Sequence, residues 1–94
     1  MKPIKYLVPL EVLEELASRS NFRLGKAIAS EGQITFEKQN TFNVIAKVRS
    51  KKGETRTVHL ESTSKGLRWK CTCSSRKDLF CQHCVAVGMY IGTI

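Results

Sequence analysis

The sequence predicts an α+β domain with an N-terminal helix, a small antiparallel β-meander and a metal site followed by a short C-terminal helix. Leucines recur at helical spacing between residues 9 and 19, and polar and apolar residues alternate in short runs between 33 and 71. All four cysteines fall between 71 and 84. At 94 residues the chain is expected to form one domain, 1–94, whose small core a metal would stabilise.

The N-terminal unit, 1–21, is expected to contain the first helix. Pro9 suits the first position of a helix, and leucines follow it at intervals of three residues, with glutamates between them. We expect this helix at about 9–19, ending before Asn21. The apolar stretch from Met1 to Leu10 is expected to pack on the sheet, or else to contact a partner or a second copy.

Residues 22–70 are predicted to form the β-meander. It begins with two short runs, 26–30 and 33–38, which flank Glu31-Gly32, a pair that suits a tight turn. The first of these runs could equally extend the N-terminal helix.

Alternation is clearest in the strand 41–50, where Phe42, Val44, Ala46 and Val48 are expected on one face. The remaining turns and strands are predicted in the order turn 51–54, strand 55–62, turn 63–66 and strand 67–71. The last strand continues into the metal site and the final helix, which together form the segment 69–92.

Composition and charge restrict the classes of function. The formal net charge is +8, and residues 47–70 carry eight basic and two acidic side chains, which points to an anionic partner, most often nucleic acid. The chain has no apolar run of the length of a signal peptide or membrane span. Clustered cysteines are unlike a disulfide framework. We therefore expect an intracellular protein, cytoplasmic or nuclear (nucleoid), that contacts no membrane.

Four side chains have the spacing of a metal site: Cys71, Cys73, Cys81 and His83. Zn²⁺ prefers four sulfur or nitrogen ligands in a tetrahedron. Because alternate residues of a strand point to the same side, the Cys-x-Cys pair can direct two thiolates at one ion. The chain then returns, and the Cys-x-His pair completes the set. Four protein ligands leave no position open for water or substrate, so one structural Zn²⁺ is expected.

Two other residues could be ligands. Cys84 in place of His83 would give an all-cysteine set, but Val85 follows it directly, and Cys84 would suit the buried side of the helix. His59 has polar neighbours on a predicted strand and is interpreted as a surface histidine.

The run Trp69-x-Cys71-x-Cys73-x7-Cys81-x-His83-x2-Ala86 resembles the SWIM zinc finger, in which C-x-C and C-x-H pairs are separated by a variable spacer. The resemblance implies upstream β-hairpins and a role in DNA binding or in protein–protein interaction, in the company of ATPases, transposases and recombination factors. Cys84 departs from the pattern, which has an aliphatic residue there.

The first functional hypothesis is a module that binds nucleic acid, most likely DNA, through its phosphate backbone and within a larger assembly. The basic side chains expected to form one face are Lys47, Arg49, Lys51, Lys52, Arg56, Lys65, Arg68, Lys70, Arg76 and Lys77. Alternatively, these side chains are only a solvated surface. Trp69 could stack on a base, although covering the metal site is favoured.

The second hypothesis is an adaptor that docks an ATPase, a recombination factor or a transcription factor without binding DNA. The chain would act as a monomer or a small homo-oligomer. An enzyme is not expected, because Asp78 has no partner carboxylate near the site and no catalytic or nucleotide-binding motif is present.

Overall fold

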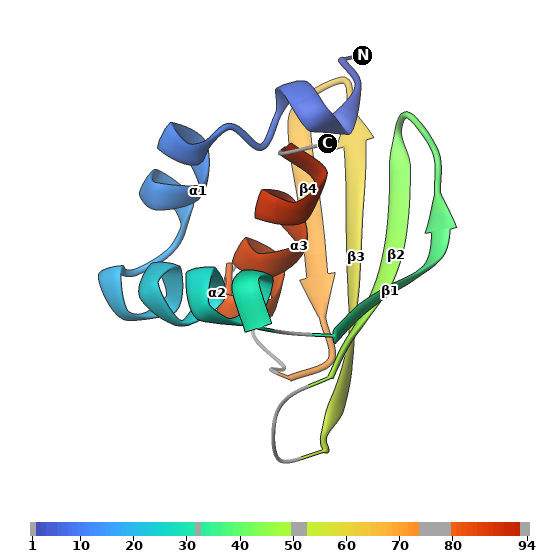
Figure 1. Cartoon of the computed structure of the whole chain (residues 1–94). Coiled ribbons are helices and arrows are strands. Elements are labelled where there is room, and N and C mark those ends of the chain that lie inside the picture. The colour runs from blue at the N-terminus through green and yellow to red at the C-terminus, as the bar shows by residue number, and fades with distance from the viewer. Residues whose placement is uncertain (1, 32, 50–52, 74–79, 93–94) are drawn as a thin grey trace.

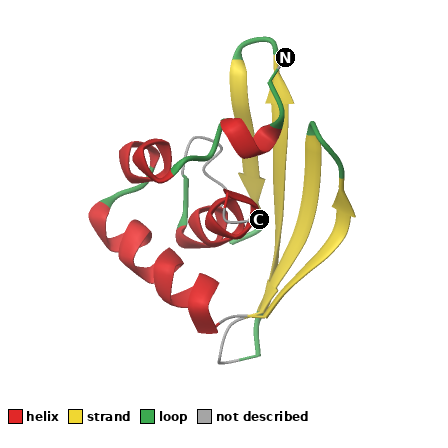
Figure 2. Cartoon of the chain, turned by 45° about the horizontal axis from the view of Figure 1, so that its top comes forward, coloured by secondary structure: helices red, strands yellow, loops and turns green. Residues whose placement is uncertain are grey.

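The computed structural model describes residues 2–31, 33–49, 53–73 and 80–92 (Figure 1). Its elements are, in order, the 3₁₀-helix η1 (Ile4–Tyr6), α1 (Leu10–Leu16), α2 (Arg19–Glu31), β1 (Gln33–Gln39), β2 (Asn43–Arg49), β3 (Thr55–Thr63), β4 (Gly66–Cys71) and α3 (Gln82–Gly92). The helices lie on one side of the sheet, which leaves its other face uncovered by the described residues (Figure 2). The predicted α+β class is confirmed.

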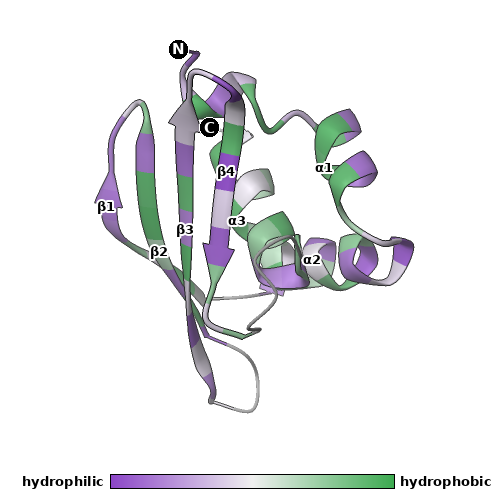
Figure 3. Ribbon diagram, turned by 180° about the vertical axis from the view of Figure 1, so that it is seen from behind, coloured by the Kyte–Doolittle hydropathy of each residue, from purple (hydrophilic) through white to green (hydrophobic). Residues whose placement is uncertain are grey.

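The sheet is an antiparallel meander in the order β1-β2-β3-β4. On β2, the side chains of Val44, Ala46 and Val48 are buried against the helices, while Lys47 and Arg49 point to the uncovered face. Figure 3 shows hydrophilic and hydrophobic residues alternating along β3 and β4. The predicted meander and the inward face of β2 are therefore confirmed.

Phe42 is an exception to that prediction. It precedes β2 and is 40% exposed, so it does not continue the buried face of this strand.

The helix α3 occupies the centre of the molecule, between the sheet and the other helices (Figure 1). Residues 83–89 and Ile91 are all buried, as expected for a helix that is apolar on every side. Its closest neighbour is α2, where an added Cβ atom at Gly25 would lie 2.4 Å from Cγ1 of Val85. Glycine at this position therefore permits close packing of the two helices.

The prediction for residues 17–31 is wrong. The range 26–30 is neither a strand nor an extension of the first helix, because it belongs to the separate helix α2. The chain leaves α1 at Ala17, and Ser18 begins the new helix: its hydroxyl accepts a hydrogen bond from the backbone N–H of Asn21 at 3.1 Å. A serine in this position satisfies a donor that the helix itself cannot.

The N-terminal segment packs on the rest of the domain, which confirms the first of its two expected roles. Ile4 and Val8 are each only 1% exposed. The Ile4 backbone N–H donates to the carbonyl of Thr41 at 2.9 Å, and the Ser62 hydroxyl donates to the carbonyl of Lys2. Among the described residues, none of the helices combines the length and the apolar character needed to cross a bilayer.

Candidate metal centre

The four predicted ligands flank the segment 74–79, which lies outside the described residues. Cys71 ends β4 and Cys73 follows two residues later, while Cys81 directly precedes α3 and His83 lies in its first turn. The ligand atoms of these four side chains all lie within 4.8 Å of one another. The structure thus brings together the end of a strand and the start of a helix at a cluster that could hold one metal ion.

Two distances within the cluster are close to those of tetrahedral coordination. The Nδ1 atom of His83 lies 3.8 Å from Sγ of Cys71 and 3.7 Å from Sγ of Cys81. A tetrahedral ion with metal–sulfur bonds of about 2.3 Å and metal–nitrogen bonds of about 2.0 Å holds its sulfur and nitrogen ligands roughly 3.5 Å apart. Contraction by a few tenths of an ångström would therefore bring Nδ1 of His83 to the spacing of a metal ligand from both sulfur atoms.

Without a metal, the side chains of the cluster have pKa values shifted in different directions. Hydrogen bonding with Cys71 and Cys81 raises the pKa of His83 to about 9. Hydrogen bonds from Cys71 and Cys84 hold the pKa of the Cys81 thiol well below its ordinary value, whereas burial raises the pKa of Cys73. A metal that binds here must displace protons from His83 and Cys73 but finds a thiolate at Cys81.

Trp69 and Phe80 form an aromatic wall beside the ligands. Trp69 points to the covered side of β4, and its ring meets that of Phe80 edge to face, with the ring centres 5.1 Å apart. Phe80 is 1% exposed and precedes Cys81 directly. This packing favours the role of a cover for the site over that of a platform for bases.

The two alternative ligands have distinct surroundings. Cys84 is fully buried on α3, as expected, with its Sγ atom 3.8 Å from Sγ of Cys81. His59 lies outside the cluster on the uncovered face of β3, where its Nε2 atom is 2.7 Å from Oδ1 of Asn43. The carboxylate of Glu61 lies 3.9 Å from the same nitrogen.

Four of the predicted basic residues point to the uncovered face of the sheet and are exposed: Lys47, Arg49, Arg68 and Lys70. Lys47 forms an ion pair with Glu37, with Nζ 2.9 Å from Oε1, and this hydrogen bond raises the pKa of Lys47. Within the described part of the chain, no ion pair is found for the other three. Lys65 is exposed in the turn between β3 and β4.

The predicted basic face does not include Arg56. This residue lies near the start of β3 and pairs with Val48 in the sheet register, so it has the same orientation as the buried side chains. Its guanidinium lies 3.2 Å from the carboxylate of Glu54. Lys51, Lys52, Arg76 and Lys77 lie outside the described residues.

Sequence reasoning missed Lys38 as a member of this face. Simple alternation from Ile34 and Phe36 would direct Lys38 inward. A β-bulge between Phe36 and Lys38 shifts the register, so that Lys38 pairs with Ile45 and points outward. A bulge of this kind leaves no local signal in the sequence.

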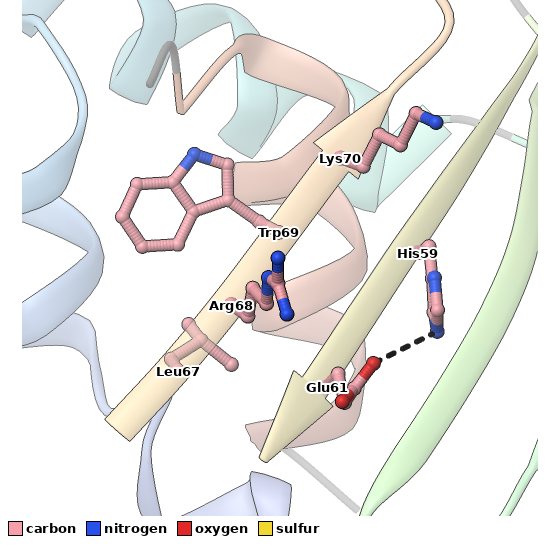
Figure 4. Close-up of a pocket in the computed structure, with 6 residues that line it drawn as sticks. All are labelled: His59, Glu61, Leu67, Arg68, Trp69 and Lys70. Carbon is pink, nitrogen blue, oxygen red and sulfur yellow. Dashed lines mark ion pairs between the residues drawn. The ribbon is translucent and has the colours of Figure 1, made fainter. Parts of the chain in front are cut away.

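A shallow pocket lies along β4 (Figure 4). Arg68 and Lys70 line it beside His59 and Glu61 of β3, and Leu67 and Trp69 contribute from the other side of the strand. Glu61 is the direct cross-strand neighbour of Arg68 and lowers the positive charge there.

Comparisons with protein-family models, with curated proteins and with solved structures find no match.

Proposed function

We propose that this chain is a SWIM-type zinc module that binds the phosphate backbone of nucleic acid, namely DNA. The cluster of Cys71, Cys73, Cys81 and His83 supports the first half of this proposal, because three thiolates and one imidazole form a donor set typical of structural zinc. The order Cys-x-Cys and Cys-x-His and the tryptophan two residues before the first ligand support the SWIM type.

The role proposed for the zinc is structural, and we propose no catalytic activity. Four protein ligands fill a tetrahedron, which leaves no position for a reactive water. The ion would join the end of β4 to the first turn of α3, the helix on which the other helices and the sheet pack. Its binding free energy then contributes directly to folding.

The observation that carries the binding half of the proposal is the uncovered face of the sheet. Arg49, Arg68 and Lys70 are exposed there and form no ion pair in the described part of the chain, although Glu61 lies opposite Arg68, and Lys38 adds a further cation. Cations spread over neighbouring strands can follow a phosphate backbone without reading the bases. The expected binding is therefore insensitive to sequence and sensitive to salt.

A salt-titrated binding assay tests this proposal with single-stranded, duplex and branched DNA. On duplex DNA, three phosphate contacts give a slope of log affinity against log salt of roughly −2.7. The variant Arg68→Ala/Lys70→Ala should lower the magnitude of this slope by about 1.8 and weaken binding.

The matched control is Arg19→Ala/Arg23→Ala, which removes the same charge from exposed positions of α2, in the helical layer. It should bind DNA nearly as well as the unmodified chain. Equal losses in the two variants, or no binding at about 50 mM salt, would contradict the proposed face.

An adaptor that docks a larger DNA-processing protein is the second candidate. A groove between α1, α2 and the end of α3 favours it, because Leu10 and Tyr90 line this groove and are 58% and 42% exposed. Exposed apolar side chains that line one groove are typical of protein contacts. For an adaptor, Leu10→Ser would abolish partner capture, while Arg68→Ala/Lys70→Ala would leave it intact.

A further inference from the structure

Cys84 is a fifth potential metal donor beside the four-ligand cluster. It follows His83 directly in the first turn of α3, its side chain is fully buried, and it takes no part in the predicted ligand set. Its Sγ atom lies 3.8 Å from Sγ of Cys81. The site thus contains four thiols and one imidazole, although structural zinc takes four ligands.

The distance from Cys84 to Cys81 matches that between two ligands of one ion. Two thiolates that bind one tetrahedral zinc at about 2.3 Å have their sulfur atoms roughly 3.8 Å apart. The separation between Cys81 and Cys84 already has this value. Cys84 could therefore share a metal with Cys81 after a small movement of its own side chain.

His83 is the donor that Cys84 can replace. The Nδ1 atom of His83 and the Sγ atom of Cys84 lie 3.7 and 3.8 Å from the same sulfur of Cys81. Because the two residues are neighbours in one helical turn, their exchange requires no change in the course of the chain. The close contact of Gly25 with Val85 fixes this turn against α2, so the exchange would occur through side-chain rotation.

We propose that Cys84 is an alternate ligand, which replaces His83 and converts a three-cysteine, one-histidine site into a four-cysteine site. In this exchange the bond from the metal to Nδ1 breaks, a bond from the metal to Sγ of Cys84 forms, and the thiol proton passes to the released imidazole. No electron is transferred, so no oxidant is required. The metal stays bound and the start of α3 stays attached to β4.

Cobalt binding to the metal-free, reduced chain tests this proposal, which rests on the proposed metal site. Co²⁺ reports tetrahedral geometry through its visible bands and the number of thiolates through the intensity of its sulfur-to-metal charge-transfer band. The variant His83→Ala should bind one equivalent of Co²⁺ tetrahedrally, with a charge-transfer band about one third stronger than that of the unmodified chain. That gain corresponds to four thiolates instead of three.

Two further variants serve as controls. Cys84→Ala should give the three-thiolate spectrum of the unmodified chain, because His83 is still present. His83→Ala/Cys84→Ala should lose the strong band and bind Co²⁺ at least tenfold more weakly than His83→Ala. If His83→Ala does not fold, His83→Asn, which keeps a polar side chain, replaces it in the comparison.

The outcomes separate the alternate ligand from the metal site itself. If the unmodified chain binds no metal, the proposed zinc module is wrong. If it binds metal but the His83 variants give a three-thiolate spectrum, bind none, or match the double variant in affinity, Cys84 is not a ligand.

Discussion

The substitution Gly25→Ala probes the close contact between α2 and α3. In an isolated helix, alanine is favoured over glycine by about 1 kcal/mol, so the substitution would stabilise α2 on its own. In the folded chain, the new Cβ atom would lie 2.4 Å from Cγ1 and 2.5 Å from Cβ of Val85, and 2.9 Å from the carbonyl oxygen of Gln82. Rotation of Val85 cannot move its Cβ atom away, and the carbonyl belongs to the backbone of α3.

The helices must therefore move apart. Overpacking of a core costs about 1–3 kcal/mol, and contact with backbone places this site in the upper part of that range. After the gain in helix propensity is subtracted, we expect a net loss of about 1–2 kcal/mol, which lowers the melting temperature of a domain this size by roughly 4–16 °C. Because the first turn of α3 carries His83, zinc affinity should fall as well.

Thermal unfolding of the zinc-loaded chain, followed by far-UV circular dichroism, measures the first effect, and competition with a chelator measures the second. Gly88→Ala is the matched control, because its new Cβ atom would approach only the end of the Leu13 side chain closely, at 2.7 Å. It should cost less than Gly25→Ala. A Gly25→Ala protein as stable as the unmodified chain, with unchanged zinc affinity, would refute this reasoning.

Three further predictions concern the metal and the core. Removal of zinc by a chelator should lower the melting temperature and reduce the helical circular dichroism signal, since metal binding contributes to folding; unchanged values would exclude a structural role. Zinc affinity should rise with pH through about 9, because hydrogen bonds with Cys71 and Cys81 raise the pKa of His83 to about 9 and the proton of His83 must leave before the metal binds. The rise should be about tenfold per pH unit for each displaced proton, measured by chelator competition, and a flat profile would exclude His83 as a ligand. Leu13→Ala, at a fully buried position, should cost about 2–5 kcal/mol in urea unfolding of the zinc-loaded chain. Leu10→Ala, at a 58% exposed position, should cost far less, and equal losses would contradict the observed burial.

The meander could be predicted from the sequence because alternation is a local signal. On β2, Val44, Ala46 and Val48 are buried, whereas Ile45 and Lys47 between them are half-buried or exposed, so one face of the strand is buried. The helix α2 could not be predicted in the same way. Only residues 27–29 of the range 26–30 are apolar, which is too short a run to show a helical period, and Gly25 is unfavourable in a helix by itself. Only packing against Val85, sixty positions later in the chain, explains a glycine there.

For the candidate site, too, some features could be predicted from the sequence and others could not. The candidate ligands that the structure brings together could be predicted from spacing, because a metal site requires certain residue types close together. The distance from Cys84 to Cys81 depends on how α3 begins and could not be derived from spacing. The basic surface was predicted less well, since the bulge beside Lys38 and the register of Arg56 are properties of strand pairing.

The uniformly buried helix α3 has a consequence for handling the protein. Most helices of a small domain keep one polar face, but from Val85 to Met89 every residue of α3 is buried. If zinc is lost and the helix detaches from β4, this stretch becomes an exposed apolar segment with no charged residue to discourage self-association. The metal would then keep the chain soluble as well as hold α3 in its folded position. Metal-free preparations should be concentrated only with care, and aggregates formed after chelation should be enriched in intermolecular contacts through this helix.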